Sequence, residues 1–253
     1  MDRDVKTALW RTLSYAIVLE LLLAGAVLFW PNFKGNIGAL KAMAPMQVMR
    51  DMVDALGKGG VDAYVNGQHF FKSCNTLGCA AAVLFAMGAV AGEAQRGTLE
   101  IWLARPLSRR RMLLERYALG ALAVSIPVFA TTLTIPWLLS LVNETTRLWP
   151  LVLCSAHESL FLLAVYSATF LWSCVGHKPT LIAFAMLFFT TFQFSMYMIQ
   201  TATHWSLFRL VDIETFGRIL SAAALDWRVC APLTAASGAF LAASLYAFAR
   251  RTP

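Results

Sequence analysis

Residues 117–141 read YALGALAVSIPVFATTLTIPWLLSL, a run of 25 residues without one charged side chain. A helix needs about 20 predominantly apolar residues to cross the hydrocarbon core of a bilayer. The run therefore predicts a membrane-spanning helix. The composition of the whole chain agrees, because 58% of its 253 residues are hydrophobic and only 14% are charged, whereas a soluble domain has about 25% charged residues.

Five further apolar runs predict five further crossings. The six predicted crossings lie at about 12–30, 74–92, 117–141, 151–174, 180–200 and 229–249. The first run is expected to be retained, because it carries Glu20 in its middle and ends in Trp30-Pro31 without the cleavage site of a signal peptide. The sequence thus predicts an all-α integral membrane protein with six transmembrane helices in a single domain, residues 1–253.

Positive charges are concentrated in alternate segments between the runs. The richer set consists of residues 1–11, 93–116, 175–179 and 250–253. The poorer set consists of residues 31–73, 142–150 and 201–228. The first set has 12 Lys or Arg in 44 residues and the second has 9 in 80, so the positive-inside rule places the first set and both termini in the cytoplasm. The net charge of +7 is expected beside lipid head groups in the cell (inner or plasma) membrane, and no nucleic-acid partner is expected.

The two longer external segments each contain a predicted helix. One extends over residues 45–56 and is stopped by Gly57, Gly59 and Gly60. It belongs to a segment with methionines at every third position, namely Met43, Met46, Met49 and Met52. Thioethers bind Cu(I), but steps of three spread the sulfurs over about half a helical turn, so apolar contact with the membrane or a partner is favoured over a copper site. The other segment, 204–228, has an apolar stripe, and both a re-entrant position and a place on the outer surface are left open.

The segment 92–109, GEAQRGTLEIWLARPLSR, is the most informative polar stretch. Gly97 permits a sharp turn where the chain leaves the bilayer. Thr98 then suits the N-cap of a short helix, which Pro106 ends by pushing its neighbour toward an extended conformation. Ser108 suits the cap of the next crossing. A helix of about two turns is marginal in water, so we expect it to bind lipid or a protein partner.

This segment resembles the GE-x-x-RGTLE-x-x-L-x-x-P-x-SR signature of the ABC-2 family of ABC transporter permeases. The resemblance implies that segment 93–109, between the second and third crossings, is a cytoplasmic coupling helix that docks onto a separate ATPase subunit and transmits its movement. The residues that it assigns to ATPase coupling are Glu93, Arg96, Gly97, Thr98, Leu99, Glu100, Ile101, Trp102, Leu103, Arg105 and Pro106.

No motif in the sequence predicts catalysis by this chain. It has no Gly-x-x-x-x-Gly-Lys-Ser/Thr loop, the loop that cradles nucleotide phosphates. ATP and Mg²⁺ are therefore expected on the partner ATPase, with no cofactor in this chain. The sequence also lacks a His-Glu-x-x-His helix and a Cys/His cluster of zinc spacing, so neither a catalytic residue nor a metal ligand is predicted.

Three ionisable residues fall inside predicted crossings, namely Glu20, His157 and Glu158. A charge at the bilayer centre costs roughly 2.5–3.5 kcal/mol on insertion scales and marks a candidate functional site. We therefore place these three residues on a possible substrate path. The alternative is a structural hydrogen bond between helices, which is equally open for Glu20 and is favoured for His157 and Glu158.

By its resemblance, the chain is expected to be the permease subunit of an ATP-driven exporter that moves an apolar or amphipathic substrate out of the cytoplasm. It would pair with a second copy or a related permease, and ATPase subunits would bind beneath. The alternatives are an integral-membrane enzyme using His157 and Glu158, or a non-transporting membrane anchor or sensor for an ATPase. The sequence leaves the substrate and the choice between a homodimer and a heterodimer open.

Overall fold

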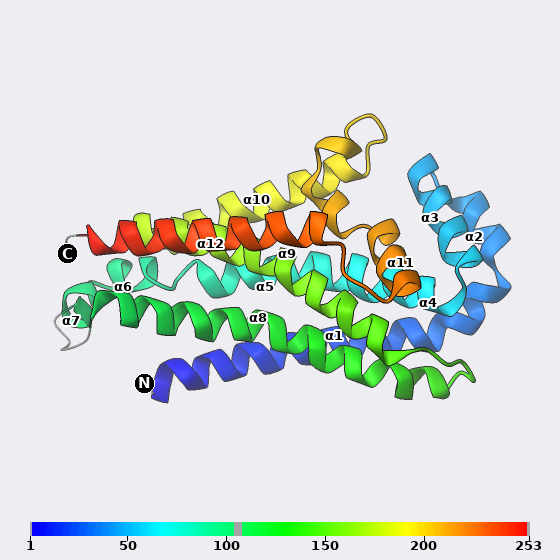
Figure 1. Ribbon diagram of the computed structural model, residues 1–253, viewed down its shortest axis with the longest axis horizontal. Helices are drawn as coiled ribbons and strands as arrows, with labels where there is room; N and C mark the ends of the chain where they lie inside the picture. Colours follow the sequence, from blue (N-terminus) through cyan, green and yellow to red (C-terminus); the bar gives the residue numbers. More distant parts are fainter. Residues whose placement is uncertain (1, 104–107, 252–253) are drawn as a thin grey trace.

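The computed structural model describes residues 2–103 and 108–251, which form helices and turns without a strand (Figure 1). The helices are α1 (Asp2–Gly35), α2 (Ile37–Met43), α3 (Gln47–Lys58), α4 (Gly60–Val65), the π-helix η1 (Asn66–Cys74), α5 (Asn75–Ala86), α6 (Ala91–Gln95), α7 (Leu99–Leu103), α8 (Arg109–Ser140), α9 (Leu148–Val175), α10 (Pro179–Tyr197), the 3₁₀ helices η2 (Thr203–Trp205) and η3 (Leu207–Val211), α11 (Ile213–Ala222) and α12 (Trp227–Ala249).

Five of these helices, α1, α8, α9, α10 and α12, are long and apolar enough to cross a membrane. They overlap five of the six predicted crossings, and the prediction of an all-helical chain is confirmed for the described residues. Helix α9 is central. Half of its apolar part is buried inside the protein, compared with 17–39% in the other four, and it packs against α12, α8 and α5.

The second predicted crossing, 74–92, has different boundaries in the structure. Helix α5 ends at Ala86 and is continued toward the N-terminus by η1 and α4, since the joining residues Val65 and Asn75 both have α-helical backbone angles. Residues 87–90 form turns. The helix ends early because the Ser173 hydroxyl of α9 accepts the N–H groups of Val90 and Ala91 and donates to the Met87 carbonyl.

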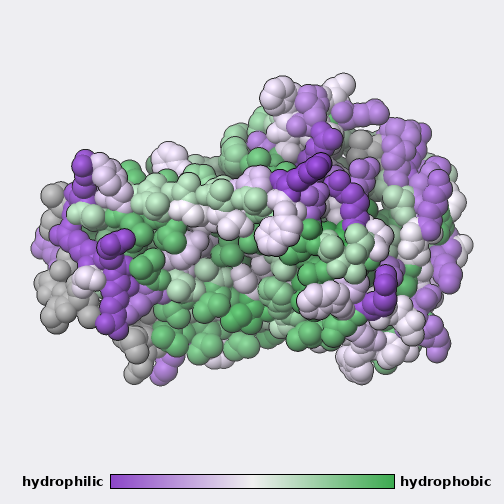
Figure 2. All heavy atoms as spheres, in the orientation of Figure 1, coloured by the Kyte–Doolittle hydropathy of each residue, from purple (hydrophilic) through white to green (hydrophobic). Residues whose placement is uncertain are grey.

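On the face shown in Figure 2, apolar side chains cover the middle of the bundle between two more polar ends. Helix α1 contributes Leu13, Ile17 and Leu21, and α10 contributes Phe184 and Phe188. Apolar patches this large on a chain with several apolar helices face lipid or a partner subunit. The chain is therefore a multi-pass membrane protein.

Both termini lie at the same end of the bundle as α6 and α7, and α2, α3 and α11 lie at the opposite end (Figure 1). Arg109, the first residue of α8, joins the start of this helix to the end of α12 by donating to the carbonyls of Ala249 and Arg251. Ser108 caps α8 by accepting the N–H of Arg111, as predicted. The basic segments at the two termini and before α8 are thus gathered at one end.

The end opposite the termini contains both predicted external helices. Helix α3 corresponds to the predicted 45–56 but continues through Gly57 to Lys58, so the predicted stop at Gly57 is wrong. Gly60, with φ +69, begins the next helix. Helix α11 carries the predicted stripe, with Phe216 and Ile219 buried. The Phe216 ring stacks on Phe70 of η1 at 5.3 Å. The four methionines do not share one helix: Met43 ends α2, Met46 directly precedes α3, and Met49 and Met52 lie in α3. Their exposure also differs, since Met43 is 80% exposed and Met52 is half-buried.

Gly120 provides a test of how closely α8 and α9 approach. A Cβ atom at this position would lie 2.1 Å from the Tyr166 hydroxyl oxygen. We expect Gly120→Ala to destabilise the protein by about 1–3 kcal/mol, measured as a lower midpoint of thermal unfolding in detergent. Tyr166→Phe in the same background should restore part of the loss, because it removes the nearest atom.

Gly238→Ala is the matched control, since nothing lies within 4 Å of a Cβ atom built there. It should leave the midpoint unchanged or raise it slightly, as alanine favours helix. An equal loss of stability in the Gly120 and Gly238 variants would show that α8 and α9 do not pack as described.

Candidate functional site

The predicted coupling segment folds as two short helices, α6 and α7, joined by a tight turn. Gly97 has φ +68, so the predicted sharp turn at this residue is present. Its N–H donates to the Ala94 carbonyl at 3.2 Å, and that of Thr98 donates to the Glu93 carbonyl at 3.0 Å. Helix α7 has five described residues. The predicted contacts Arg105 and Pro106 lie outside the described residues.

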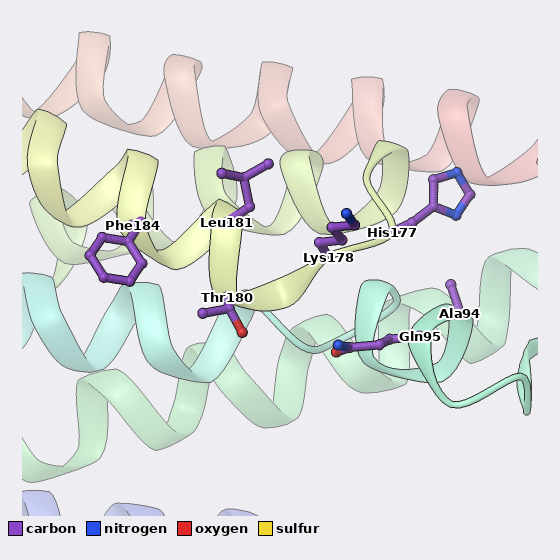
Figure 3. A pocket seen from close by; sticks show the side chains of 7 residues that line it. All are labelled: Ala94, Gln95, His177, Lys178, Thr180, Leu181 and Phe184. Carbon is purple, nitrogen blue, oxygen red and sulfur yellow. The ribbon is translucent and has the colours of Figure 1, made fainter.

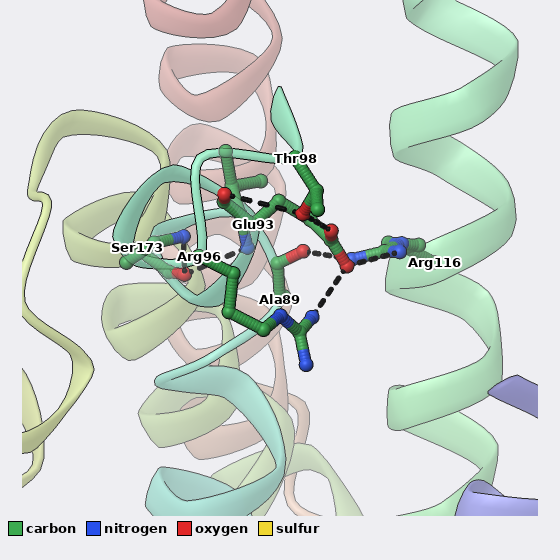
Figure 4. A network of polar contacts seen from close by, with 8 residues as sticks. Ala89, Glu93, Arg96, Thr98, Arg116 and Ser173 are labelled. Carbon is green, nitrogen blue, oxygen red and sulfur yellow. Dashed lines mark hydrogen bonds and ion pairs between the residues drawn. The ribbon is translucent and has the colours of Figure 1, made fainter. Parts of the chain in front are cut away.

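The Glu93 carboxylate joins α6 to the neighbouring elements (Figure 4). It accepts from Arg96 at 2.7 Å, from Arg116 of α8 at 3.0 Å, and from the Thr98 hydroxyl. Arg116 also donates to the carbonyl of Ala89. Thr98, predicted as a helix cap, thus directs its hydroxyl to Glu93. Glu93 and Arg96, predicted as contacts for an ATPase, bind each other within the chain.

The surroundings of Glu93 keep it ionised. Burial alone would raise the pKa of its carboxyl, but hydrogen bonds from Thr98 and Arg116 and the positive charges of Arg116 and Arg96 outweigh burial and lower the pKa below its usual value. A carboxyl with a lowered pKa stabilises the fold fully above its ordinary pKa of about 4.3, and this stabilisation is lost as the pH falls through the lower value. The Glu93 contacts are therefore complete at neutral pH.

Two further residues hold this end of the bundle together, and the sequence did not identify them. Ser173 binds the backbone between α5 and α6, as described above. Arg251 donates to the carbonyls of Ser173, Cys174 and Gly176 at the end of α9. A positive charge at the C-terminal end of a helix also interacts favourably with the helix dipole. Arg116 was visible only as part of a basic segment, and Ser173 gave no signal because its partners lie more than 80 residues away.

Helix α7 presents one face to the protein and another to its surroundings. Leu99 is 5% exposed and belongs to the core, whereas Ile101 is 69% exposed. Glu100 is also exposed. The backbone of Trp102 and Leu103 completes α7, and their side chains lie outside the description. Leu99 therefore fixes α7 to the bundle, while Glu100 and Ile101 remain accessible to another surface.

The three ionisable residues of the predicted substrate path contact different groups. Glu20 accepts from the Thr134 hydroxyl at 3.0 Å, which joins α1 to α8. His157 contacts the Leu210 carbonyl through Nε2 at 2.7 Å and Cys230 through Nδ1 at 3.5 Å. Glu158 is completely buried, and neither carboxylate oxygen has a hydrogen-bond partner among the described residues. The structure does not bring these residues into one site.

A groove of about 530 Å³ lies between α6 and α10 at the same end as α7 (Figure 3). Its polar part contains Gln95, His177 and Lys178, and its apolar part contains Leu181 and Phe184. His177 also contacts Arg251 at 3.2 Å. The groove adds cationic and apolar surface beside the coupling segment.

Glu93→Gln tests whether this carboxylate holds the coupling segment. The change removes the ionic partner of two arginines, and each hydrogen bond to a charged group contributes about 1.5–3 kcal/mol. We expect amide hydrogen exchange of residues 93–101 to accelerate at least tenfold, measured by mass spectrometry in detergent. Glu115→Gln at the same end is the control, because its ion pair with Arg111 is exposed and contributes less than about 1 kcal/mol. Equal exchange in both variants would contradict the assigned role of Glu93.

Comparison with protein-family models matches residues 12–211 to the family described as ABC-2 family transporter protein. The match begins in α1, ends at the last residue of η3 and includes the whole of segment 92–109. A comparison with curated proteins gives no match. Since the family model covers well over half of the sequence, the chain belongs to the ABC-2 family of transporter proteins.

Proposed function

We propose that this chain is the membrane-spanning permease subunit of an ATP-driven exporter whose ATP hydrolysis takes place on a separate subunit. Family membership supports a transporter subunit. The proposal rests on one structural observation: the short helix α7 exposes Glu100 and Ile101 at one end of the bundle. An exposed isoleucine beside a carboxylate suits docking onto a protein surface, where apolar centres are surrounded by polar groups.

The proposed topology has six crossings, with the stretch from Gly60 to Ala86 as the second. Its parts α4, η1 and α5 have 6, 9 and 12 residues, so the continuous helix is roughly 40 Å long at 1.5 Å per residue. This length exceeds a hydrocarbon core of about 30 Å. An even number of crossings is consistent with both termini lying at one end (Figure 1), and the positive-inside rule assigns this end to the cytoplasm.

The contacts of α6 and α7 supply a physical route for coupling. Glu93 joins α6 to Arg116 of α8, Ser173 joins the preceding backbone to α9, and Leu99 is buried. A displacement of α7 by a bound ATPase would therefore be transmitted to α8 and α9, which both pack against α5. Such a movement would rock the bundle against a second copy or a related permease. The cargo that fits this largely apolar bundle is an apolar or amphipathic compound.

The enzyme alternative has less support than transport. A general base needs a nitrogen available to the substrate, but both ring nitrogens of His157 already contact groups of this chain, Leu210 and Cys230. Glu158, its neighbour in sequence, is completely buried. A membrane anchor or sensor would need the same docking surface as a permease. A measurement of transport distinguishes these two functions.

Association with an ATPase tests this proposal. The full chain and an ABC ATPase encoded beside it should co-purify in detergent, and the chain in nanodiscs should change the rate of ATP hydrolysis. Ile101→Asp should weaken association at least tenfold, because a charge replaces an apolar contact and a central contact contributes about 2 kcal/mol. Met43→Asp, an equally exposed apolar site at the opposite end, should leave association unchanged.

Two results would contradict the proposal. One is the absence of a complex when both proteins are folded. The other is a complex that Met43→Asp weakens as much as Ile101→Asp, which would place the ATPase elsewhere. A complex that hydrolyses ATP but moves no compound across a vesicle membrane in a substrate screen would favour the anchor or sensor.

A further inference from the structure

A second and larger cavity, of about 760 Å³, lies under the coupling segment. Helix α1 contributes Arg11 to its lining, α8 contributes Arg116, and α9 contributes Tyr166. Glu93 and Arg96 line it from the coupling segment itself. The cavity is therefore bounded by elements that are far apart in the sequence and meet only in the folded chain.

The charge on the cavity wall is positive. The lining contains three arginines, Arg11, Arg96 and Arg116, and one carboxylate, that of Glu93. Both Arg96 and Arg116 contact that carboxylate, whereas Arg11 is exposed and its guanidinium makes no hydrogen bond or ion pair with another described residue. Three arginines and one carboxylate give the lining a formal net charge of +2, and Arg11 is the arginine among them without a carboxylate partner in the described part of the chain. Guanidinium groups bind phosphate through paired hydrogen bonds, so the wall suits a phosphate ester.

The cavity also has a direction from polar to apolar. On α8 the lining passes from Arg116 to Leu119 and on to Ala123, which lies about 10 Å further along the helix. Phe85 and Tyr166 add aromatic surface. An inorganic anion would use the arginines and leave this apolar surface bare. A molecule with a phosphate at one end and a hydrocarbon chain at the other would cover both parts.

We propose that this cavity is a binding site for an anionic phospholipid of the membrane leaflet next to α7, with its phosphate between Arg11 and Arg96 and an acyl chain toward Phe85 and Ala123. The site is separate from the groove beside α10 and from the buried Glu158. The proposal does not depend on the proposed transport function, because binding of a lipid requires neither an ATPase nor a cargo.

Occupancy of this site would affect the coupling segment directly. Arg96, Thr98 and Ile101 belong to both the cavity lining and the segment around α7. A phosphate that binds Arg96 would hold this segment against α1 through Arg11. The lipid would thereby order the surface that we assign to the ATPase contact.

Native mass spectrometry of the full chain in detergent tests the site, with phosphatidylglycerol and phosphatidylcholine as the added lipids. A contact between a basic residue and an anionic lipid contributes about 1 kcal/mol, or roughly fivefold in affinity. We expect phosphatidylglycerol to bind more tightly than phosphatidylcholine. Arg11→Gln should weaken its binding about fivefold and the Arg11→Gln/Arg96→Gln double variant about 25-fold, with Arg11→Lys retaining most of it.

Arg110→Gln is the matched control, because Arg110 is exposed at the same end but does not line the cavity. Equal weakening by Arg110→Gln, or equal binding of the two lipids, would overturn the site in favour of a general attraction to basic surface. A second comparison uses glycerol phosphate, which has the phosphate ester but no acyl chains. If it binds as tightly as phosphatidylglycerol, the site is one for a soluble phosphate ester and the lipid assignment is wrong. Thermal unfolding of each lipid-free variant verifies that it is folded.

Discussion

The Ser173 hydroxyl satisfies three backbone groups at the point where the chain leaves α5, and the rest of this end of the bundle depends on that arrangement. It accepts two N–H groups and donates to one carbonyl, all in a buried region where unsatisfied groups would each cost several kcal/mol. Because the helix ends at Ala86, residues 87–98 can turn and carry α7 to the end of the bundle.

Electrostatics then fixes the position of the turn. Glu93 is ionised and shared between Arg96 and Arg116, which ties α6 to α8, while Leu99 is buried in the core. These contacts leave Glu100 and Ile101 as the exposed part of α7. A surface that is held rigidly and exposes an apolar residue can transmit force, which a loose loop cannot. The proposed function relies on this rigidity, and the proposed lipid site lies immediately beneath it.

Much of this architecture was predictable because it depends on local patterns. The apolar runs predicted six crossings, five of which overlap long apolar helices. Gly97 predicted the turn, Ser108 predicted the cap of α8, and the spacing of apolar residues predicted the apolar stripe of α11. The boundaries of the helix at the second predicted crossing were not predictable, because the turn after Ala86 is bound by Ser173, which is remote in sequence. The partner of Glu93 was missed for the same reason, since Arg116 lies in the next long helix. That the Glu158 carboxylate has no hydrogen-bond partner among the described residues appears only when the surrounding helices are assembled.

In the proposed function, the end of the bundle that carries α7 faces an ATPase in the cytoplasm. Photo-crosslinking from a photoreactive amino acid at Glu100 tests this orientation. The same group at Trp205, which is exposed in η2 beyond the C-terminal end of α10, provides the comparison. If α7 docks onto the ATPase, position 100 gives a crosslink to the ATPase subunit and position 205 gives none. A crosslink from position 205, or none from position 100 in an intact complex, would contradict the assigned orientation and the role of α7.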